Sequence, residues 1–522
     1  MSKADPDSSA ARAQGNAQQW WTLGAVCGAT FMLLVDITIV QVALPTIQRK
    51  LHASFADLQW VISAYAVSLA ALLLTHGSLA DRFGRKRVFM WGVTVFSASS
   101  LACGLSTTSA ILIGARAVQG VGGAAMFATG LALIGQEFRG PERGTALALW
   151  GATVGGAVAI GPLIGGALTS AFGWQWIFYV NVPVGILTLA IAGWRMANVR
   201  DPEARRLDWL GLVTFSGSLF FLVFALTRGN DDGWSSRPIV AFFAAALLLM
   251  IAFVAVEHVQ RRPMFDLSLF RKPAFVGVSV GTFAIGAGMF AMFPYLTLYL
   301  QNDLGLSPLQ GGVRLLPLTL LTFVVPLATR SAVARTAPGL VLGVGLGISA
   351  CGLALMDLVD ASSTWVVLLP GFLVAGLGIG LANPAIARIA LGVVPPERSG
   401  MASGINNTFR LAGVATGVSA LGAVFQQRLA TSLVPAFGHR SGAVAQAVAA
   451  GGVGTAARLP VSAGSGVVAA RHAFVAGTEG ILVIGAVTVL AGALFAGFVR
   501  GRDFHQHTMP VGATLEAELA SG

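Results

Sequence analysis

The stretch Gly77-Ser-Leu-Ala-Asp81-Arg82-Phe-Gly84-Arg85-Lys86-Arg87 decides the fold of this chain. It places four cations and one carboxylate between two long apolar runs. Eleven residues of this kind are too few to form a domain and too polar to lie in the hydrocarbon of a bilayer. The stretch therefore predicts a tight turn at a membrane surface. Gly77 and Gly84 supply its backbone freedom, and the three cations at 85–87 hold it on the inner side.

The composition agrees with a membrane protein. The 522 residues are 55% hydrophobic and 11% charged, with a mean hydropathy of +0.76, whereas a soluble domain has about 25% charged residues. The net charge of +11 does not indicate a nucleic-acid partner, because the cations lie in short turns between apolar runs. The three cysteines lie inside apolar runs without metal-ligand spacing, so no metal site is predicted.

Fourteen apolar runs are long enough to cross the hydrocarbon core, which takes about 20 helical residues. They lie at about 22–46, 59–79, 88–106, 109–135, 145–171, 175–195, 209–227, 238–258, 274–300, 312–334, 338–358, 364–391, 401–427 and 475–499. With the N-terminus inside, the inner segments carry 22 Lys and Arg residues and the outer segments carry 8. This bias predicts a multi-pass protein of the inner (cytoplasmic) membrane with both termini in the cytoplasm.

An internal repeat divides the chain into two similar halves. Pro141-Glu-Arg-Gly144 returns as Pro396-Glu-Arg-Ser-Gly400, at an offset of 255 residues. Spans 1–6 therefore match spans 9–14, with spans 7 and 8 inserted between them. Such repeats are typical of transporters, in which the substrate binds between the halves near the bilayer midplane. The predicted fold is an all-α integral membrane protein with 14 transmembrane helices, arranged as two pseudo-symmetric six-helix bundles plus two inserted central helices.

This architecture divides the chain into five segments. They are a disordered cytoplasmic N-terminal tail (1–19), an N-terminal six-helix bundle (20–196), two inserted helices (197–262), a C-terminal six-helix bundle (263–500) with a long external loop at about 428–474, and a cytoplasmic tail (501–522). The external loop is rich in Ala, Gly and Ser, and its sequence leaves open whether it forms a hairpin or a helix.

Four stretches resemble the signatures of a known family. The opening stretch resembles the inner-loop signature of the major facilitator superfamily. Residues 34–45 are similar to the first-span signature of its fourteen-span drug:proton antiporters, with Gln41 where that family commonly carries Asn. Arg116-Ala-Val-Gln119-Gly120 and Gly161-Pro162-Leu-Ile-Gly165-Gly166 resemble its fourth-span and fifth-span motifs. The resemblance runs from about residue 20 to 500.

The resemblance implies a monomeric exporter of drugs or antibiotics that exchanges its substrate for protons. It also implies that Asp81 binds a helix N-terminus of the opposite half, as a latch for one conformation. The residues expected to act in gating are Gly77, Asp81, Arg82, Gly84, Arg85 and Lys86 in the first motif, and Gly161, Pro162, Gly165 and Gly166 in the antiporter motif. The four-residue spacing of the glycines in the second motif independently predicts close helix packing, and its proline predicts a kink.

Asp36 is the acid that the span boundaries place deep in the membrane. A charge at the bilayer centre costs about 2.5–3.5 kcal/mol on insertion scales, so such residues face a cavity or a partner. Asp36 lies roughly 20 Å above the inner surface and Arg116 roughly 10 Å below the outer one, which are the same depth in a core about 30 Å thick. We expect Asp36, Arg116 and Gln119 to form a proton-coupling group. The alternative is a permanent structural network.

Candidates for the substrate cavity are weaker. They are polar or aromatic residues of apolar spans, namely Gln41, Tyr295, Tyr299, Asn406, Asn407 and Arg410. For the aromatic residues, packing is the alternative role. For Arg410 it is extension of the side chain towards the membrane surface.

These observations predict a proton-coupled antiporter that exports small hydrophobic drugs or antibiotics by alternating access. The alternative is proton-coupled uptake or export of a specific endogenous metabolite. No catalytic constellation and no phosphate-binding Gly-x-x-x-x-Gly-Lys-Ser/Thr motif occurs in the sequence, so we expect neither an enzyme nor an ATP-driven pump, and no cofactor besides the proton gradient. With a single deep carboxylate, the expected substrate is neutral or monocationic.

Overall fold

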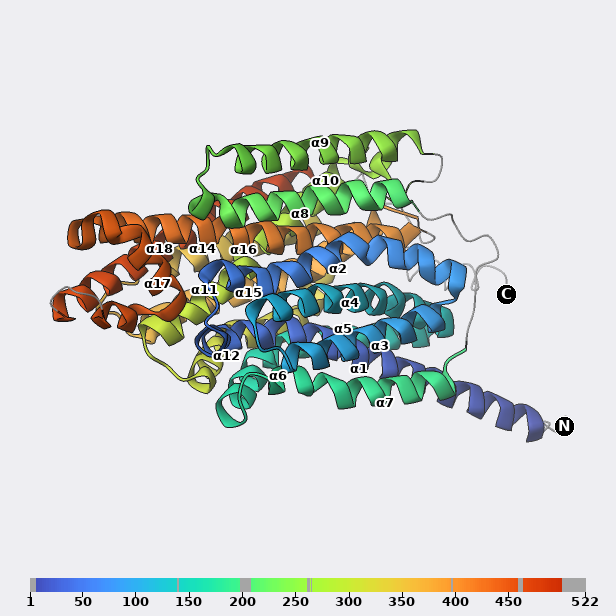
Figure 1. Cartoon of the computed structure of the whole chain (residues 1–522). Coiled ribbons are helices and arrows are strands. Elements are labelled where there is room, and N and C mark those ends of the chain that lie inside the picture. Colours follow the sequence, from blue (N-terminus) through green and yellow to red (C-terminus); the bar gives the residue numbers. More distant parts are fainter. Residues whose placement is uncertain are drawn as a thin grey trace.

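The computed structural model describes residues 6–138, 140–197, 208–260, 263, 265–395, 398–458 and 463–499. In these ranges every regular element is a helix. The long helices lie side by side with roughly parallel axes, which gives an elongated bundle (Figure 1). The predicted tail at 501–522 and residues 198–207 of the predicted inserted segment lie outside the described residues.

The N-terminal half consists of α1 (Pro6–Leu51), α2 (Phe55–Phe83), α3 (Arg85–Gly104), α4 (Ser109–Glu137), α5 (Gly140–Ala171), α6 (Trp176–Tyr179) and α7 (Asn181–Arg195). The inserted pair is α8 (Trp209–Asp232) and α9 (Arg237–Val259). The C-terminal half begins with η1 (Leu267–Arg271), α10 (Pro273–Ala284), η2 (Ile285–Met289), η3 (Phe290–Met292), α11 (Phe293–Leu298) and η4 (Tyr299–Asp303). It continues with α12 (Pro308–Ala328), α13 (Arg330–Arg335), α14 (Pro338–Met356), η5 (Trp365–Val367), α15 (Leu368–Gly392), α16 (Ser399–Phe437), η7 (Gly438–Arg440), α17 (Ser441–Gly451), η8 (Val453–Arg458), α18 (Ala463–Phe495) and η9 (Ala496–Phe498).

Each predicted span corresponds to a helix or a run of consecutive helices. Thirteen segments of the described chain are long and apolar enough to cross a membrane. The remaining predicted span, at 88–106, is α3. This 20-residue helix opens with Arg85, Lys86 and Arg87 and is less apolar than the others. The predicted fold class, an all-α membrane protein built from two bundles and an inserted pair, is confirmed.

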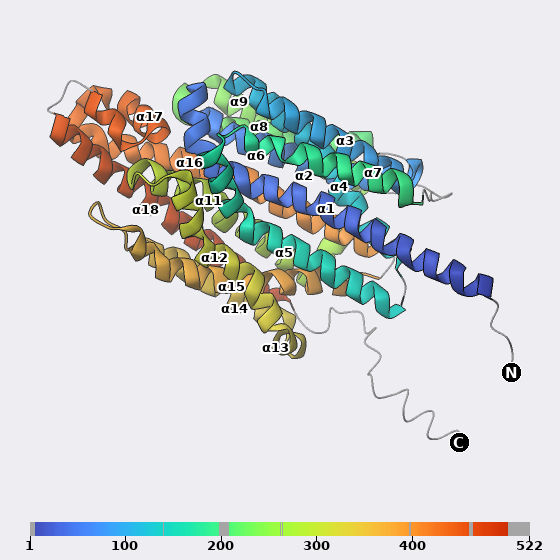
Figure 2. The same cartoon turned by 90° about the horizontal axis from the view of Figure 1, so that it is seen from below.

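The two halves repeat the same packing. In the N-terminal half α1 packs on α5 and α7, and α3 packs on α4. In the C-terminal half α10 packs on α16 and α18, and α14 packs on α15. Figure 2 shows the blue-to-cyan half beside the yellow-to-red half. The pair α8–α9 lies against α2 of the first half and α16 of the second (Figure 1).

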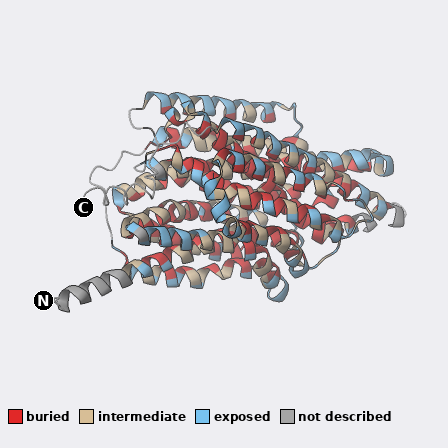
Figure 3. Ribbon diagram, turned by 180° about the vertical axis from the view of Figure 1, so that it is seen from behind, coloured by how far each residue is buried: buried red, intermediate tan, exposed pale blue. Residues whose placement is uncertain are grey.

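The outer surface of the bundle is apolar. Figure 3 shows exposed residues on the outward faces of the helices and buried residues between them. On α9, Leu247, Leu248 and Ile251 are 62%, 65% and 56% exposed. Such a surface is stable in lipid and costly in water, which agrees with a multi-pass membrane protein.

Two segments differ from the predictions, and a third was left open by the sequence. Residues 6–19, expected to be disordered, belong to α1. The described part of the segment at about 428–474 is largely helical, because α16 continues to Phe437 and α17 and η8 follow it. The turn in the opening stretch is a single residue, Gly84, whose φ of 99° favours glycine. Gly77 lies inside α2 with open space where a Cβ would stand, so Gly84 alone makes the turn.

The inserted helix α8 contacts the two halves by different kinds of interaction. Its Thr227 hydroxyl donates to Ser419 Oγ at 2.9 Å, and Asn230 Nδ2 donates to the Ala423 carbonyl at 2.7 Å, both on α16. Towards α2 the contacts are aromatic, with Phe220 and Phe224 beside Trp60. Polar bonds therefore join α8 to the C-terminal half.

Glycines allow α3 and α4 to pack with backbones in contact. A Cβ on Gly122 would lie 2.5 Å from the backbone nitrogen of Phe96, and one on Gly92 would lie 2.7 Å from Ala125 Cβ. We predict that Gly122→Ala lowers stability by at least about 1–3 kcal/mol, because the backbone of α3 cannot yield as a side chain can. Thermal unfolding of the purified protein in detergent measures the effect.

The matched control is Gly114→Ala on the same helix. No atom lies within 4 Å of its added Cβ, and alanine is the better helix former by about 1 kcal/mol, so this variant should be at least as stable as the parent. Equal melting temperatures for the two variants would contradict the packing argument.

A buried carboxylate–arginine site and the interface between the halves

Asp36 and Arg116 meet inside the N-terminal half. Arg116 Nη1 donates to Asp36 Oδ2 at 2.5 Å, and the side chains of Arg116 and Asp36 are 2% and 0% exposed. Gln119 lies one turn after Arg116 on α4, and its Nε2 donates to Asp36 Oδ1 at 2.9 Å. Arg116 Nη1 also donates to Gln119 Oε1 at 2.7 Å. The structure therefore brings together the three residues that the depth argument selected.

Two further side chains complete the site. Asn181, the first residue of α7, donates from Nδ2 to Asp36 Oδ1 at 3.1 Å and to Ser100 Oγ at 3.0 Å. The guanidinium of Arg116 lies 4.2 Å from the ring centre of Tyr65, and its Nε donates to the Val61 carbonyl at 3.1 Å. Sequence reasoning missed these partners, although an amide inside the apolar span predicted at 175–195 was a visible signal for Asn181.

The site can hold one charge pair away from water. Three donors surround the Asp36 carboxylate, and Arg116 keeps a carbonyl and an aromatic face as partners that do not depend on Asp36. A buried pair of this kind is costly to desolvate and is stable only with such extra hydrogen bonds. Protonation of Asp36 would remove the attraction without removing every partner of Arg116, which is the property that a proton-coupling site needs.

The antiporter-like motif of α5 contacts both halves. A Cβ on Gly161 would collide with Thr38 of α1, and one on Gly165 would lie 2.9 Å from the Ile39 carbonyl oxygen. A Cβ on Gly166 would lie 2.5 Å from the carbonyl oxygen of Pro308, which begins α12. The Pro162 carbonyl of α5 faces Gly312 of α12. The motif thus joins α1, which carries Asp36, to the opposite half.

The opening stretch binds its own half. Lys86 Nζ donates to the carbonyls of Gly193 and Met196 at 2.9 and 2.8 Å, at the end of α7. Arg85 donates to the Ala132 carbonyl on α4 and, at 3.3 Å, to Asp81 Oδ1. Cations at helix C-termini are favourable. Among the described residues Asp81 pairs with Arg85 of its own half, and the expected contact with a helix N-terminus of the opposite half is not seen among them in this conformation. Arg82 lies over the neighbouring Phe83 ring.

Among the cavity candidates, the two tyrosines and Gln41 are buried. Tyr295 accepts a hydrogen bond from Gln59 Nε2 at 3.2 Å and donates to the Val418 carbonyl, so it joins the halves. Tyr299 packs against Phe474 inside the C-terminal half. Gln41 is 5% exposed on α1. These three side chains serve packing and contacts between helices in this structure.

The three candidates on α16, Asn406, Asn407 and Arg410, do not all face the same way. Asn406 is buried and accepts from Thr282 of α10 at 3.0 Å. Asn407 and Arg410 are half-buried, and Arg410 Nη2 donates to Asn407 Oδ1 at 2.5 Å. The structure thus separates Asn406 from the pair that follows it.

Several contacts between the halves lie where α1 ends and α2 begins. Gln301 Nε2 donates to the Val42 carbonyl of α1 at 2.8 Å. Phe55, at the start of α2, stacks on Phe425 of α16 with ring centres 5.7 Å apart. The Gln59–Tyr295 bond lies one turn further along α2. These contacts close the interface at that end in this conformation.

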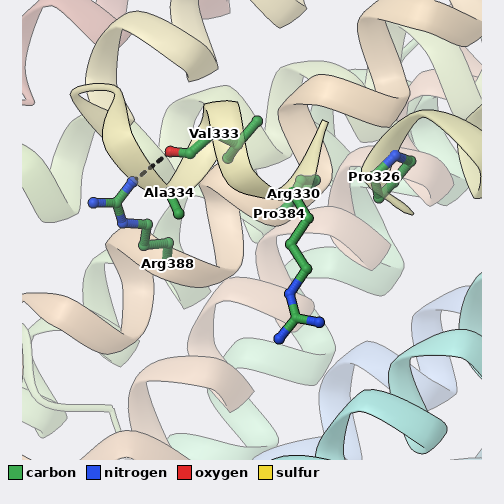
Figure 4. A pocket seen from close by; sticks show the side chains of 6 residues that line it. All are labelled: Pro326, Arg330, Val333, Ala334, Pro384 and Arg388. Atoms are coloured by element: carbon green, nitrogen blue, oxygen red, sulfur yellow. Dashed lines mark hydrogen bonds between the residues drawn. The ribbon is translucent and has the colours of Figure 1, made fainter. Parts of the chain in front are cut away.

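A small open pocket lies elsewhere, within the C-terminal half (Figure 4). It is lined by Pro326, Arg330, Val333, Ala334, Pro384 and Arg388, and Arg388 donates to the Val333 carbonyl at 2.7 Å. The pocket lies beside α13, at the position that the repeat assigns to the opening stretch, so it does not coincide with the Asp36 site.

The fold and the site together define a multi-pass membrane transporter with two similar halves. A family model described as Major Facilitator Superfamily matches residues 26–418, and the chain belongs to that superfamily. A bacterial homolog of the human lysosomal transporter Spinster, solved in an inward-facing, unoccupied conformation, has a TM-score of 0.62 and 17% identity. The match covers 93% of this chain and 98% of that one, and it shows a shared fold.

Several similar proteins are named as resistance proteins. The tetracenomycin C resistance and export protein of Streptomyces glaucescens is 34% identical over 497 residues, with 91% of this chain and 90% of that protein covered. The puromycin resistance protein pur8 of Streptomyces alboniger is 35% identical, with 81% and 84% covered. The multidrug resistance protein Stp of Mycobacterium tuberculosis is 33% identical, with 80% and 78% covered.

The buried pair generates a prediction about stability. Arg116→Leu leaves the Asp36 carboxylate buried without its cation, which should cost about 3–5 kcal/mol. Adding Asp36→Asn removes that charge and should restore part of the loss. Denaturation of the single and double variants in detergent measures the coupling, and strictly additive losses would contradict a direct charge pair.

Proposed function

We propose that the protein exports small hydrophobic drugs or antibiotics across the cytoplasmic membrane, driven by proton entry. The observation that carries the proposal is the carboxylate of Asp36, fully buried and held by Arg116, Gln119 and Asn181. Membership of the superfamily and the similarity to three resistance proteins support export of toxic compounds. The bias of Lys and Arg towards the inner segments supports cytoplasmic termini.

The proposed cycle couples a proton to the position of α1. When Asp36 is ionised, Arg116 holds α1 against α4 and α7 through the hydrogen-bonded group. A proton on Asp36 weakens that attraction, and Arg116 keeps the Val61 carbonyl and Gln119 as partners. Gly165 packs on α1 and Gly166 on α12, so movement of α1 reaches the opposite half through α5. The interface between the halves then opens at the end that is closed in this structure and closes at the opposite end, which gives alternating access.

Asp36→Asn tests the coupling. Asparagine keeps the shape of the side chain and cannot carry the proton, so we expect substrate-driven proton release to fall at least about 100-fold. The measurement uses everted membrane vesicles with a preformed pH gradient, to which tetracenomycin C, puromycin and other hydrophobic antibiotics are added. Radiolabelled accumulation in the same vesicles gives the direction of transport.

The matched control is Asp360→Asn, in the loop after α14. Asp360 is exposed, and the hydroxyls and one backbone N–H of Ser362 and Ser363 donate to it and lower its pKa. This variant should transport like the parent protein. Unchanged gradient-driven export in Asp36→Asn would remove Asp36 from the coupling mechanism, whereas uptake in place of export in the parent would favour the metabolite alternative.

A further inference from the structure

Arg410 is a cation in the middle of the membrane. It lies eleven residues after Ser399, the first residue of α16, which is about 16 Å along the helix and about half of the hydrocarbon thickness. A charged residue at this depth faces a partner or a polar cavity, because lipid would cost it several kcal/mol. The neighbours of Arg410 therefore decide its role.

The partner of Arg410 within the described chain is neutral. Its Nη2 donates to the amide oxygen of Asn407 at 2.5 Å. The five ion pairs of the described residues all involve other side chains. Arg116, by comparison, contacts a carboxylate at the same 2.5 Å. Of the two arginines, only Arg410 carries a charge that the described residues leave without a counter-ion.

The helix directs Arg410 towards the space between the halves. Thr408 of α16 donates to the Ala70 carbonyl of α2, and Gly404 faces Leu74 of the same helix. On another face Asn406 contacts Thr282 of α10, and Gly413 packs on the Phe283 carbonyl. At 100° per residue, positions 407 and 410 lie on the arc between these two faces. That arc faces the region between α2 of one half and α10 of the other.

Asp36, the acid deep in the membrane, does not neutralise the charge of Arg410. Asp36 is fully buried and its carboxylate is bound by Arg116, Gln119 and Asn181 from α4 and α7 of its own half. Asp303, the last residue of η4, forms an ion pair with Arg471 of α18. The charge that the interface presents at mid-depth is therefore positive.

We propose that Arg410, positioned by Asn407, binds an anionic oxygen of the substrate at the interface. This inference rests on the proposed export function and names the substrate class: apolar molecules that carry a carboxylate. The guanidinium has five N–H donors in one plane, of which Asn407 occupies one, so the others suit a two-oxygen acceptor. The expected charge of the substrate is thus the opposite of the one that Asp36 alone suggested, because the structure pairs Asp36 with Arg116.

The test uses three probes with one aromatic body and different charge: 1-pyrenebutyrate, 1-pyrenebutanol and 1-pyrenebutyl-trimethylammonium. Binding to the purified full-length protein in detergent is measured at neutral pH by energy transfer from tryptophan, with protein-free micelles as the blank. The parent protein should bind the anion more tightly than the alcohol, and the cation least. Arg410→Gln should weaken binding of pyrenebutyrate about tenfold or more and leave pyrenebutanol within about twofold.

Two variants keep the test interpretable. Arg410→Lys retains the cation and should recover part of the affinity for pyrenebutyrate. Arg314→Gln removes another arginine within a span, one that donates to its own helix at Gln310 and lies over Trp365, and it should bind all three probes like the parent. Melting temperatures of the variants show whether each is folded.

Each outcome is informative. Selective loss of pyrenebutyrate binding in Arg410→Gln, with recovery in Arg410→Lys, supports the proposal. Binding of the probes without preference for the anion, or equal loss for all three in a folded variant, overturns it and leaves the export function standing. If the parent protein binds none of the probes and exports none of the antibiotics in vesicles, the proposed function fails as well.

Discussion

The cost of a charge in hydrocarbon is the constraint on which this structure depends. It explains why cations gather in the turns, why Asp36 and Arg116 meet at one depth, and why four helices of the N-terminal half converge on that pair. The pair contributes little net stability compared with apolar packing. It does set the rotation of α1, α4 and α7 about their axes, because every donor near the carboxylate must face it. The remaining helices pack around this arrangement.

Hydropathy, charge bias and the repeat were sufficient to predict the fold, because each reports a property that the membrane imposes on single helices. The meeting of Asp36, Arg116 and Gln119 was predictable for the same reason, since depth follows from residue count. Residue count places Asn181 at a similar depth, but depth alone does not show that its side chain faces Asp36, because it does not fix the rotation of the helix. The extent of α16 beyond its predicted span was left open by the sequence, since hydropathy does not distinguish a helix from a hairpin in the segment at about 428–474.

The orientation of a side chain within a span was the least predictable property. The sequence placed Asn406, Asn407 and Arg410 in one group of candidates, but a helix turns by 100° per residue. Tertiary packing against α2 and α10 decides which of them faces the interface. The same limit applies to Asp81, whose motif indicated an inner turn and whose side chain pairs in this conformation with Arg85. Lys86 instead caps α7 and Arg85 binds a carbonyl of α4, so the turn stabilises its own bundle.

The polar bonds of α8 to α16 determine which parts of the molecule move as units. Hydrogen bonds such as Thr227–Ser419 and Asn230–Ala423 are directional and break when helices slide, whereas the ring contacts between α8 and Trp60 of α2 persist over a range of positions. In the proposed cycle, a relative rotation of the halves would carry α8 and α9 with the C-terminal bundle. The two moving bodies have unequal cross-sections, and lipids around the larger one must rearrange more in each cycle. If the proposed cycle operates, bilayer composition would influence the rate of transport.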